Sequence, residues 1–402
     1  MAIYEPQEDS FLLQKVLKEY AFGRVLDMGT GSGIQALTAM RFPNVREVVA
    51  VDINPEAIAV LKEKVKAEKI RKVTVLAGDL FEQVSGQFNL ILFNPPYLPQ
   101  DKGILDTALY GGKKGWEISA RFFEEVSSYL FPEGIILFLF SSHTNKKKID
   151  EILTHHLFEF KEVAQEKMAF EQLYVYEIKK STLLRVLEKR GIHHIGYHAK
   201  GKRGFVYSGM LDKTIFVKKA IPTQKDSTRV AIKVEREDST AINRIANEVK
   251  WLEIVNKESI GPKLLYAGEQ YFVMEFVTGV FIEEFISKAH CESAHKVLLH
   301  ILKQCFILDM MGVSKEEMHH PVKNIIVDSL GQPTLIDFER CTLTEKPQNV
   351  TQFVEFICRL SLGLKKKGWA FDVHLLREAA KDYKVEFNKE CFDALVRLLK
   401  VC

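Results

Sequence analysis

Over residues 1–180, short apolar runs alternate with segments in which apolar side chains recur every three or four positions. The runs predict buried strands, and the segments between them predict helices. A helix is expected over residues 10–20, and strands are expected over residues 24–27, 48–52, 73–79, 88–93 and 134–140. Because strand and helix signals alternate, the pattern favours an α/β fold with a parallel sheet covered on both faces.

The strand predicted over residues 88–93 ends in Asn94-Pro95-Pro96-Tyr97, where two prolines stop both strand and helix. Neither proline carries an N–H, so the carbonyl of Pro95 has few local donors. The oxygen of Asn94 and this carbonyl, side by side, would form a receptor for the two hydrogens of a planar –NH2 group, on which Tyr97 could stack. These four residues are the candidate catalytic residues, and the simpler alternative is a proline-rich turn.

A glycine-rich stretch, Gly29-Thr30-Gly31-Ser32-Gly33, follows the first predicted strand shortly after Asp27. Glycines at alternate positions let the backbone turn tightly and approach a ligand. The second and third strands end in Asp52 and Asp79, and ligands of doubly wound sheets bind at such strand ends. An acid at the end of the second strand suits the hydroxyls of a ribose, although Asp52 and Asp79 could each be a helix cap.

The third glycine comes one residue earlier than in the nicotinamide fingerprint, and an acid precedes the loop; this pattern resembles S-adenosylmethionine-dependent methyltransferases. Together with Tyr4-Glu5-Pro6 and with residues 94–97, it resembles the HemK-type glutamine N5-methyltransferases that modify peptide-chain release factors, in their archaeal and eukaryotic branch. The resemblance implies a doubly wound class I (Rossmann-like) methyltransferase sheet for residues 1–180. It also implies methylation of the glutamine in the Gly-Gly-Gln loop of a class I release factor.

The same resemblance assigns roles to residues. It implies that S-adenosylmethionine is bound by Asp27, Gly29, Thr30, Gly31, Gly33, Asp52, Asp79 and Asn94. It implies that the substrate is positioned by Tyr4, Glu5 and Pro6. It further implies a small zinc-binding activator protein that pairs with a sheet edge, for which the apolar strand over residues 45–51 is the candidate.

A second interpretation of the receptor stays open, because the N6 amino group of adenine presents the same two hydrogens. DNA and RNA adenine methyltransferases share the Asn-Pro-Pro-Tyr motif. Against them, residues 1–180 carry 22 Lys and Arg and 25 Asp and Glu, a net charge of −3 that disfavours binding to duplex phosphates. The sequence also shows no separate insert that would recognise a flipped base.

In residues 181–402 the motifs follow the order of a protein kinase. Lys233 lies in an apolar strand, Glu248 lies in a helix, and Asn324 and Asp337 come later. The order resembles the small kinase-like fold of the RIO and Bud32 kind, which implies an α+β two-lobed domain. By this resemblance, ATP is bound by Gly201, Gly204, Lys233, Glu248 and Glu275, and Mg²⁺ is bound by Asn324 and Asp337.

The second half departs from the kinase pattern at two positions. His319 stands where the catalytic aspartate is expected, five residues before Asn324, and Glu339 replaces the glycine of the Asp-Phe-Gly motif. A histidine lacks the negative charge that orients a hydroxyl near magnesium. Two interpretations therefore stay open: a kinase, and a module that binds ATP and delivers the substrate without phosphorylating it.

A chain of 402 residues exceeds the usual size of one core, so two domains are expected, residues 1–180 and 181–402. The second carries 34 Lys and Arg against 28 Asp and Glu, and a net charge of +6 would attract RNA or the ribosome. No apolar stretch is long enough for a membrane span, and no export signal is evident. The six cysteines lack C-x-x-C spacing, which predicts reduced thiols and a cytoplasmic location.

Overall fold

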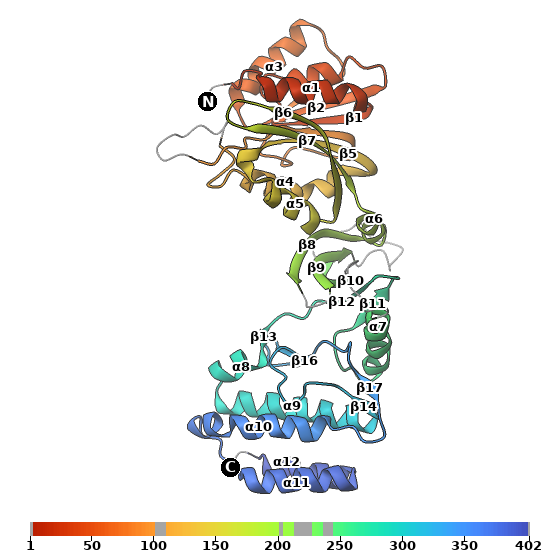
Figure 1. The fold of residues 1–402 in the computed structure, drawn as a ribbon, viewed down its shortest axis with the longest axis vertical. Helices are drawn as coiled ribbons and strands as arrows, with labels where there is room; N and C mark the ends of the chain where they lie inside the picture. Colours follow the sequence, from red (N-terminus) through yellow and green to blue (C-terminus); the bar gives the residue numbers. More distant parts are fainter. Residues whose placement is uncertain (1–2, 101–109, 201–203, 213–226, 236–243, 401–402) are drawn as a thin grey trace. The chain divides into compact units, whose positions relative to one another are not determined.

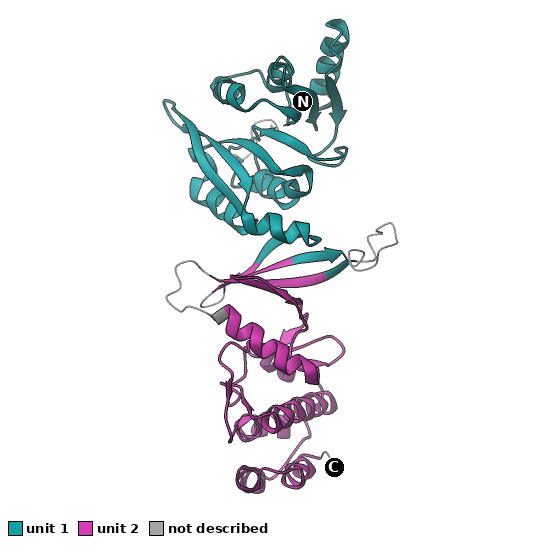
Figure 2. Cartoon of the chain, turned by 90° about the vertical axis from the view of Figure 1, so that its right-hand side faces the viewer, with its two compact units in different colours: residues 1–197, 209–228 teal, residues 198–208, 229–402 magenta. Residues whose placement is uncertain are grey.

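The structure is a computed structural model, in which residues 3–100, 110–200, 204–212, 227–235 and 244–400 are described (Figure 1). The chain divides into two compact units (Figure 2). Residues 1–197 and 209–228 form the first unit, and residues 198–208 and 229–402 form the second. The first unit extends past residue 180, and the domain boundary expected there stays a prediction. Among the described residues, no helix is both long and apolar enough to cross a membrane.

The first unit alternates helices and strands, as its apolar pattern predicts. The helices are α1 (Glu8–Tyr20), α2 (Ile34–Ala39), α3 (Pro55–Ala67), α4 (Glu117–Glu125), α5 (Lys146–His155) and α6 (Thr182–Lys189). The strands up to residue 180 are β1 (Gly23–Met28), β2 (Val45–Asp52), β3 (Val73–Ala77), β4 (Phe88–Phe93), β5 (Leu130–Ser141), β6 (Phe158–Lys167) and β7 (Gln172–Lys180). The predicted helix and the predicted strands all form, with ends that differ by a few residues.

These strands make one seven-stranded sheet in the order β3-β2-β1-β4-β5-β7-β6. The pairs from β3 to β5 are parallel, whereas β7 pairs antiparallel with β5 and with β6. The expectation of a parallel sheet is wrong for β7, which runs opposite to the other six strands, because the short turn between β6 and β7 can join only antiparallel neighbours. The strand order reverses between β1 and β4, where Met28 pairs with Phe93. Doubly wound sheets bind their ligands beyond the strand ends at this reversal.

Neighbouring residues of the central strands face opposite sides of the sheet. Leu137 and Leu139 of β5 join the apolar cluster formed with α1, α2 and α3. Between them, Phe138 stacks on Phe140 and meets Phe123 of α4 edge to face. Figure 1 accordingly shows α1 and α3 on one side of the sheet and α4 and α5 on the other. Burial on both faces is the reason that these strands are apolar throughout.

The strand over residues 45–51 is not a sheet edge. β2 lies between β1 and β3, and Val49 pairs with Leu26 on one side and with Thr74 on the other. The prediction that an activator protein pairs with this strand is therefore wrong, because its backbone groups are already used within the sheet. The sheet ends at β3 and β6.

The second half of the chain opens with a five-stranded sheet in the order β11-β12-β10-β9-β8. These strands are β8 (Ile192–Lys200), β9 (Gly204–Asp212), β10 (Ser227–Glu235), β11 (Leu264–Ala267) and β12 (Tyr271–Glu275). Short strands follow: β13 (Val280–Phe281), β14 (Val313–Ser314), β15 (Ile325–Val327), β16 (Pro333–Leu335) and β17 (Thr342–Leu343). The helices are α7 (Arg244–Val255), α8 (Ile282–Lys288), α9 (Cys291–Met310), α10 (Asn349–Lys366), α11 (Val373–Glu386) and α12 (Lys389–Leu398).

The helices of the second unit enclose a large apolar core. Leu298 and Leu302 of α9 and Phe353 of α10 are fully buried in it. Phe338, which follows β16, is fully buried in the same core. Its burial fixes the segment that carries the acids on either side of it, Asp337 and Glu339.

Candidate active site

A cavity of about 280 Å³ opens at the carboxyl ends of β1, β2 and β4. Most residues predicted for the cofactor and the substrate line it, namely Tyr4, Asp27, Gly29, Thr30, Gly31, Asp52, Asp79, Asn94, Pro95, Pro96 and Tyr97. The fold therefore brings together segments that lie as far apart as the N-terminus and the end of β4. Glu5, Pro6 and Gly33 do not line this cavity.

The loop after β1 requires glycine for two different reasons. Gly29 and Gly31 have φ angles of +65° and +50° and line the cavity; few other residues adopt this conformation. Gly33 has a φ angle of +80°, and a Cβ there would lie 2.4 Å from Cδ1 of Leu61. Gly33 therefore permits close packing of the start of α2 on α3, away from the cavity.

Asp27 is a buried acid near the end of β1. Its Oδ2 accepts hydrogen bonds from the hydroxyl of Thr30 at 2.6 Å and from the backbone N–H of Ala36 at 3.0 Å. Burial raises the pKa of Asp27 to about 7, although both hydrogen bonds oppose the rise. A carboxyl in this state ionises readily when a cation is placed beside it.

Asp52, at the end of β2, is held in place by backbone donors. The N–H of Gly31 donates to its Oδ2 and the N–H of Asn54 donates to its Oδ1, each at 2.8 Å. Beside it, Ile53 is 57% exposed and lines the cavity. The carboxylate suits hydroxyl donors, and the apolar side chain suits the face of a flat ring.

Asp79 follows β3 and forms an ion pair with Arg121 of α4, at 2.8 Å between Oδ2 and Nη2. Arg121 also lines the cavity. It was not among the predicted site residues, because nothing in the sequence indicates that α4 reaches this strand end. The pair joins β3 to α4 along one wall of the cavity.

The side chain of Asn94, directly after β4, is oriented by Asp9. Its Nδ2 donates to Oδ2 of Asp9 at 2.9 Å. A carboxylate oxygen only accepts hydrogen bonds, so the amide nitrogen of Asn94 faces Asp9 and its Oδ1 faces away. That oxygen is buried and has no hydrogen-bond partner among the described residues. A buried acceptor without a donor costs about 1–3 kcal/mol, and a ligand that brings a donor removes the cost.

Asp9 is itself fixed, with only 4% of its surface exposed. Its Oδ2 also accepts from the hydroxyl of Tyr4 at 3.1 Å, and its Oδ1 accepts from the backbone N–H and the hydroxyl of Ser10. Burial and the neighbouring Asp9 raise the pKa of Tyr4. Asp9 was not predicted as a site residue. It is the group that sets the direction of the Asn94 amide.

A glycine loop after β1, an acid at the end of β2 and a cavity at the reversal of strand order are typical of a doubly wound sheet that binds a cofactor, and the match to a methyltransferase family model makes this unit a class I S-adenosylmethionine-dependent methyltransferase. Residues 7–174 match the model of the methyltransferase small domain family. A protein of Methanocaldococcus jannaschii, assigned by name to the protein N5-glutamine methyltransferases, is 39% identical over 178 residues, 43% of this chain and 89% of that protein. The chain belongs to the protein-glutamine N5-methyltransferase, or HemK, family.

One further relative and one solved structure are also similar to this chain. The release factor glutamine methyltransferase of Deinococcus radiodurans is 34% identical over 148 residues, which are 34% of this chain and 53% of that protein. Among solved structures, the Mtq2–Trm112 complex of E. cuniculi, described as responsible for methylation of the eRF1 translation termination factor, is similar. It has a TM-score of 0.38 and 24% identity, and the match covers 45% of this chain and 100% of that chain.

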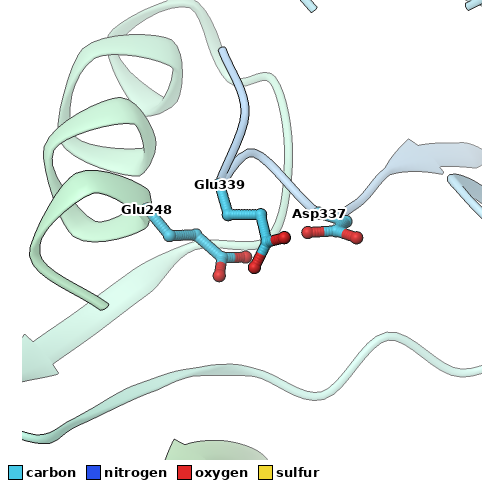
Figure 3. Close-up of side chains that lie close together, drawn as sticks. All are labelled: Glu248, Asp337 and Glu339. Carbon is cyan, nitrogen blue, oxygen red and sulfur yellow. The ribbon is translucent and has the colours of Figure 1, made fainter. Parts of the chain in front are cut away.

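In the second unit, Lys233 of β10 is surrounded by three acids. Its Nζ lies 2.5 Å from Glu248 of α7, 3.7 Å from Asp337 and 4.0 Å from Glu339. Although burial alone would lower it, the pKa of Lys233 is raised by these carboxylates, most strongly by Glu248. Figure 3 shows the three carboxylates converging, with oxygen atoms within 4.8 Å of one another. Glu339, which departs from the kinase pattern, thus belongs to the cluster.

Asn324 and Asp337, which were predicted to bind Mg²⁺, both accept hydrogen bonds through their backbone carbonyls. Asn324 is 7% exposed, and its carbonyl accepts at 2.8 Å from the N–H of Ile336, the residue before Asp337. Asp337 has a φ angle of +62°, and its carbonyl accepts from Nζ of the buried Lys315. These contacts hold the backbone of the acid-bearing segment.

Gly201, Gly204 and Glu275 were also predicted to bind ATP, and His319 stands in the place of the catalytic aspartate. Gly204 is buried at the start of β9, where a Cβ would lie 2.6 Å from the carbonyl oxygen of Val234. Glu275 is exposed at the end of β12, and His319 is also exposed. Gly201 lies outside the described residues. Gly204 is therefore explained by close strand approach alone.

Proposed function

We propose that residues 1–180 methylate the glutamine in the Gly-Gly-Gln loop of a class I peptide-chain release factor. One observation carries the assignment to this cavity: the buried Oδ1 of Asn94 lacks a donor among the described residues. A glutamine side-chain amide brings two N–H donors. A relative named as a release factor glutamine methyltransferase supports the choice of substrate.

The residues of the cavity fit S-adenosylmethionine. Asp27 would hold the ammonium group of the cofactor, and Asp52 would hold its ribose hydroxyls. The backbone at Gly29 and Gly31 would approach closely, because neither residue has a Cβ. When bound, the cofactor supplies a methyl group on a sulfonium, which is open to attack by a nucleophile. The buried carboxyl of Asp27 fits a cationic ligand in particular, since a cation lowers a pKa that burial has raised.

The receptor would activate the amide through hydrogen bonds. The amide nitrogen of glutamine is a poor nucleophile, because its lone pair is delocalised into the carbonyl. Oδ1 of Asn94 and the carbonyl of Pro95 would each accept one N–H, which increases the electron density on nitrogen and aims its lone pair. On methylation the nitrogen loses one of these protons, which passes from its hydrogen bond to water.

Substitution of Asn94 tests this assignment. Asn94→Ala should abolish methylation of a purified release factor while cofactor affinity stays within about threefold, since the acceptor contacts the substrate. Asp52→Ala should instead weaken cofactor binding. Mass spectrometry of the Gly-Gly-Gln peptide and calorimetry of cofactor binding provide the two readouts. Methylation of DNA or tRNA adenine, with none of the release factor, would establish the adenine-N6 alternative.

We also propose that residues 181–402 form a kinase-like domain that binds ATP and Mg²⁺. The lysine–glutamate pair between β10 and α7, with Asp337 beside it, supports this proposal. Labelled ATP and magnesium distinguish its two versions. Autophosphorylation or phosphorylation of the release factor indicates a kinase, whereas ATP binding without turnover indicates a delivery module. The exposed His319, which stands in place of the catalytic aspartate, favours the delivery module.

Two partner proposals follow from charge and from the sheet. The net charge of +6 on residues 181–402 would draw the chain to the ribosome or RNA and so deliver the substrate. The full chain should then have a lower KM for the release factor than residues 1–180 alone, and added salt should remove the difference.

A small zinc-binding activator would pair with β3, which ends the sheet. Equal yield and activity with and without a co-expressed activator would exclude it.

A further inference from the structure

The lysine surface beside the glutamine receptor consists of two segments, Lys113-Lys114 and Lys146-Lys147-Lys148, from which Lys114 and Lys148 approach the ring of Trp116. We propose that this lysine surface docks an acidic segment of the protein substrate, next to the glutamine that is methylated. The proposal rests on the proposed function of the cavity and concerns how a whole protein is recognised there.

The first lysine pair is anchored to the receptor by its loop. The N–H of Gly111 donates to the carbonyl of Leu98 at 3.0 Å, and the N–H of Gln100 donates to the carbonyl of Gly112 at 3.0 Å. Gly115 has a φ angle of +85°, and a Cβ there would lie 2.5 Å from the carbonyl oxygen of Tyr97. The loop that carries Lys113 and Lys114 therefore packs directly on the residues that follow the Asn-Pro-Pro stretch.

The second lysine group is anchored to the same point. The hydroxyl of Thr144 donates to the carbonyl of Tyr97 at 3.2 Å. Two residues later α5 begins with Lys146, Lys147 and Lys148. Both basic segments thus attach to Tyr97, so the lysines stand beside the substrate end of the cavity.

Trp116 links the two groups. The Nζ atoms of Lys148 and Lys114 lie 5.2 Å and 5.8 Å from the centre of its ring. At this distance an ammonium is attracted to the face of an aromatic ring. The ring therefore holds two positive charges close together on one surface.

Several of these charges are available to a partner. Lys113, Lys114 and Lys147 are exposed and form no ion pair with any described residue. Lys146 pairs with Glu162 and Lys148 pairs with Glu151. Glu117, whose carboxylate accepts from the N–H of Lys114, is the third nearby acid. Lys114, Lys146 and Lys148 thus lie beside three glutamates, and Glu8 and Glu171 are further acids near the hydroxyl of Tyr97. The positive charge open to a partner is that of the exposed lysines Lys113, Lys114 and Lys147.

An acidic protein segment fits this surface better than RNA does. The interleaved glutamates would repel a continuous chain of phosphates, whereas separate aspartate or glutamate side chains can each reach one ammonium. The chain belongs to a family named for the methylation of protein glutamines, which supports a protein partner at this surface.

The test uses the full chain and two substrates, a full-length release factor and an uncharged peptide that contains Gly-Gly-Gln. The variant Lys113→Glu/Lys114→Glu/Lys147→Glu is compared with Lys15→Glu/Lys18→Glu/Lys64→Glu. The latter reverses three exposed lysines on α1 and α3 and so matches the change in net charge. A third variant, Lys113→Gln/Lys114→Gln/Lys147→Gln, removes the charges without reversing them.

We expect the first variant to raise the KM for the release factor by more than about tenfold, with unchanged kcat, because the loss of three exposed ion pairs is worth roughly a factor of two each and the new glutamates also repel the acidic segment. The glutamine variant should give a smaller rise, and the control variant should give none. Rates on the uncharged peptide should stay equal in all of them. Equal KM values in all variants, or inhibition of the wild type alone by polyuridylate, would overturn the proposal. If the wild type methylates neither the release factor nor the peptide, the proposed function fails and the docking proposal fails with it.

Discussion

The replacement of Asp9 by asparagine offers a sharp test of how the receptor is built. The carboxylate accepts four hydrogen bonds, from Asn94, Tyr4 and the N–H and hydroxyl of Ser10. In Asp9→Asn one oxygen becomes an –NH2 group, which can only donate. If that group faces Asn94, the amide of Asn94 turns over and presents its own –NH2 group to the cavity. The glutamine nitrogen then meets a donor where the wild type presents an acceptor.

The size of the effect follows from the bond that is lost. A hydrogen bond that involves a charged or activated partner contributes about 1.5–3 kcal/mol, and 1.4 kcal/mol corresponds to a factor of ten in rate. We therefore expect kcat for Asp9→Asn to fall about 10- to 100-fold, with an unchanged Kd for the cofactor. Single-turnover methylation at saturating cofactor measures the first quantity, and calorimetry measures the second.

Two companion variants separate orientation from a general loss of structure. Asp150 accepts a hydrogen bond from the hydroxyl of Tyr176 at 2.9 Å on another part of the unit, so Asp150→Asn should leave kcat unchanged. In Asp9→Asn/Asn94→Asp, the new carboxylate accepts from the new amide and turns its second oxygen to the cavity. This double variant should be faster than Asp9→Asn. If Asp9→Asn keeps kcat within twofold of the wild type, or if the double variant is the slowest of all, Asp9 does not orient the receptor.

Four other predictions follow from single residues. Burial raises the pKa of Asp27 to about 7. Cofactor affinity should therefore fall about tenfold for each pH unit below about 7 and stay constant above it, because only the ionised carboxyl attracts a cation. Calorimetry across pH 6 to 8 measures this affinity, and Asp27→Asn should abolish its pH dependence. The same shift makes the ligand-free fold lose stability as the pH rises from about 4 to about 7, since the unfolded chain ionises first, and a comparison of melting temperatures with Asp27→Asn shows it. Gly33→Ala should cost about 1–3 kcal/mol in unfolding free energy, because its Cβ would lie 2.4 Å from Leu61, whereas Gly331→Ala, with a φ angle of +78° and open space, should cost less. Lys233→Met leaves Glu248 buried without its nearest positive charge and should destabilise the second unit by about 3–5 kcal/mol, as denaturant unfolding would show, with recovery in Lys233→Met/Glu248→Leu.

The central strands were predictable because their residues are buried on both faces and leave no ambiguity of pattern. The order of strands was not, and Val49 shows the reason. A buried parallel strand is apolar whether it lies second or last in the sheet, so the apolar stretch over residues 45–51 could not reveal that β3 lies outside it. The antiparallel direction of β7 was not predicted either, since pairing direction depends on the turn between β6 and β7.

Asp9 was missed although the sequence carries a signal for it. Leu12, Leu13, Val16 and Leu17 form the buried stripe of α1, and Asp9 lies on that stripe one turn earlier. A charged residue on the apolar face of a helix requires a buried partner. The partner, Asn94, is 85 positions away, and no local pattern indicates that distance. Glu339 was similarly treated as a departure from the kinase pattern, because only the fold shows that it approaches Lys233.

The acids of the cavity and its acceptor differ in one respect that bears on selectivity. Asp27 and Asp52 already accept hydrogen bonds from the protein, in each case including a backbone N–H, so the cofactor end of the cavity is formed before any ligand arrives. Oδ1 of Asn94 has no such donor among the described residues. A site that holds an unsatisfied polar group rejects ligands without the matching hydrogen by as much as about 10⁴-fold. Glutamate, which has no N–H, is excluded on this ground, whereas adenine is not. The receptor therefore does not by itself choose between a protein and a base, and the proposed docking surface that carries Lys113, Lys114 and Lys147 would supply that choice.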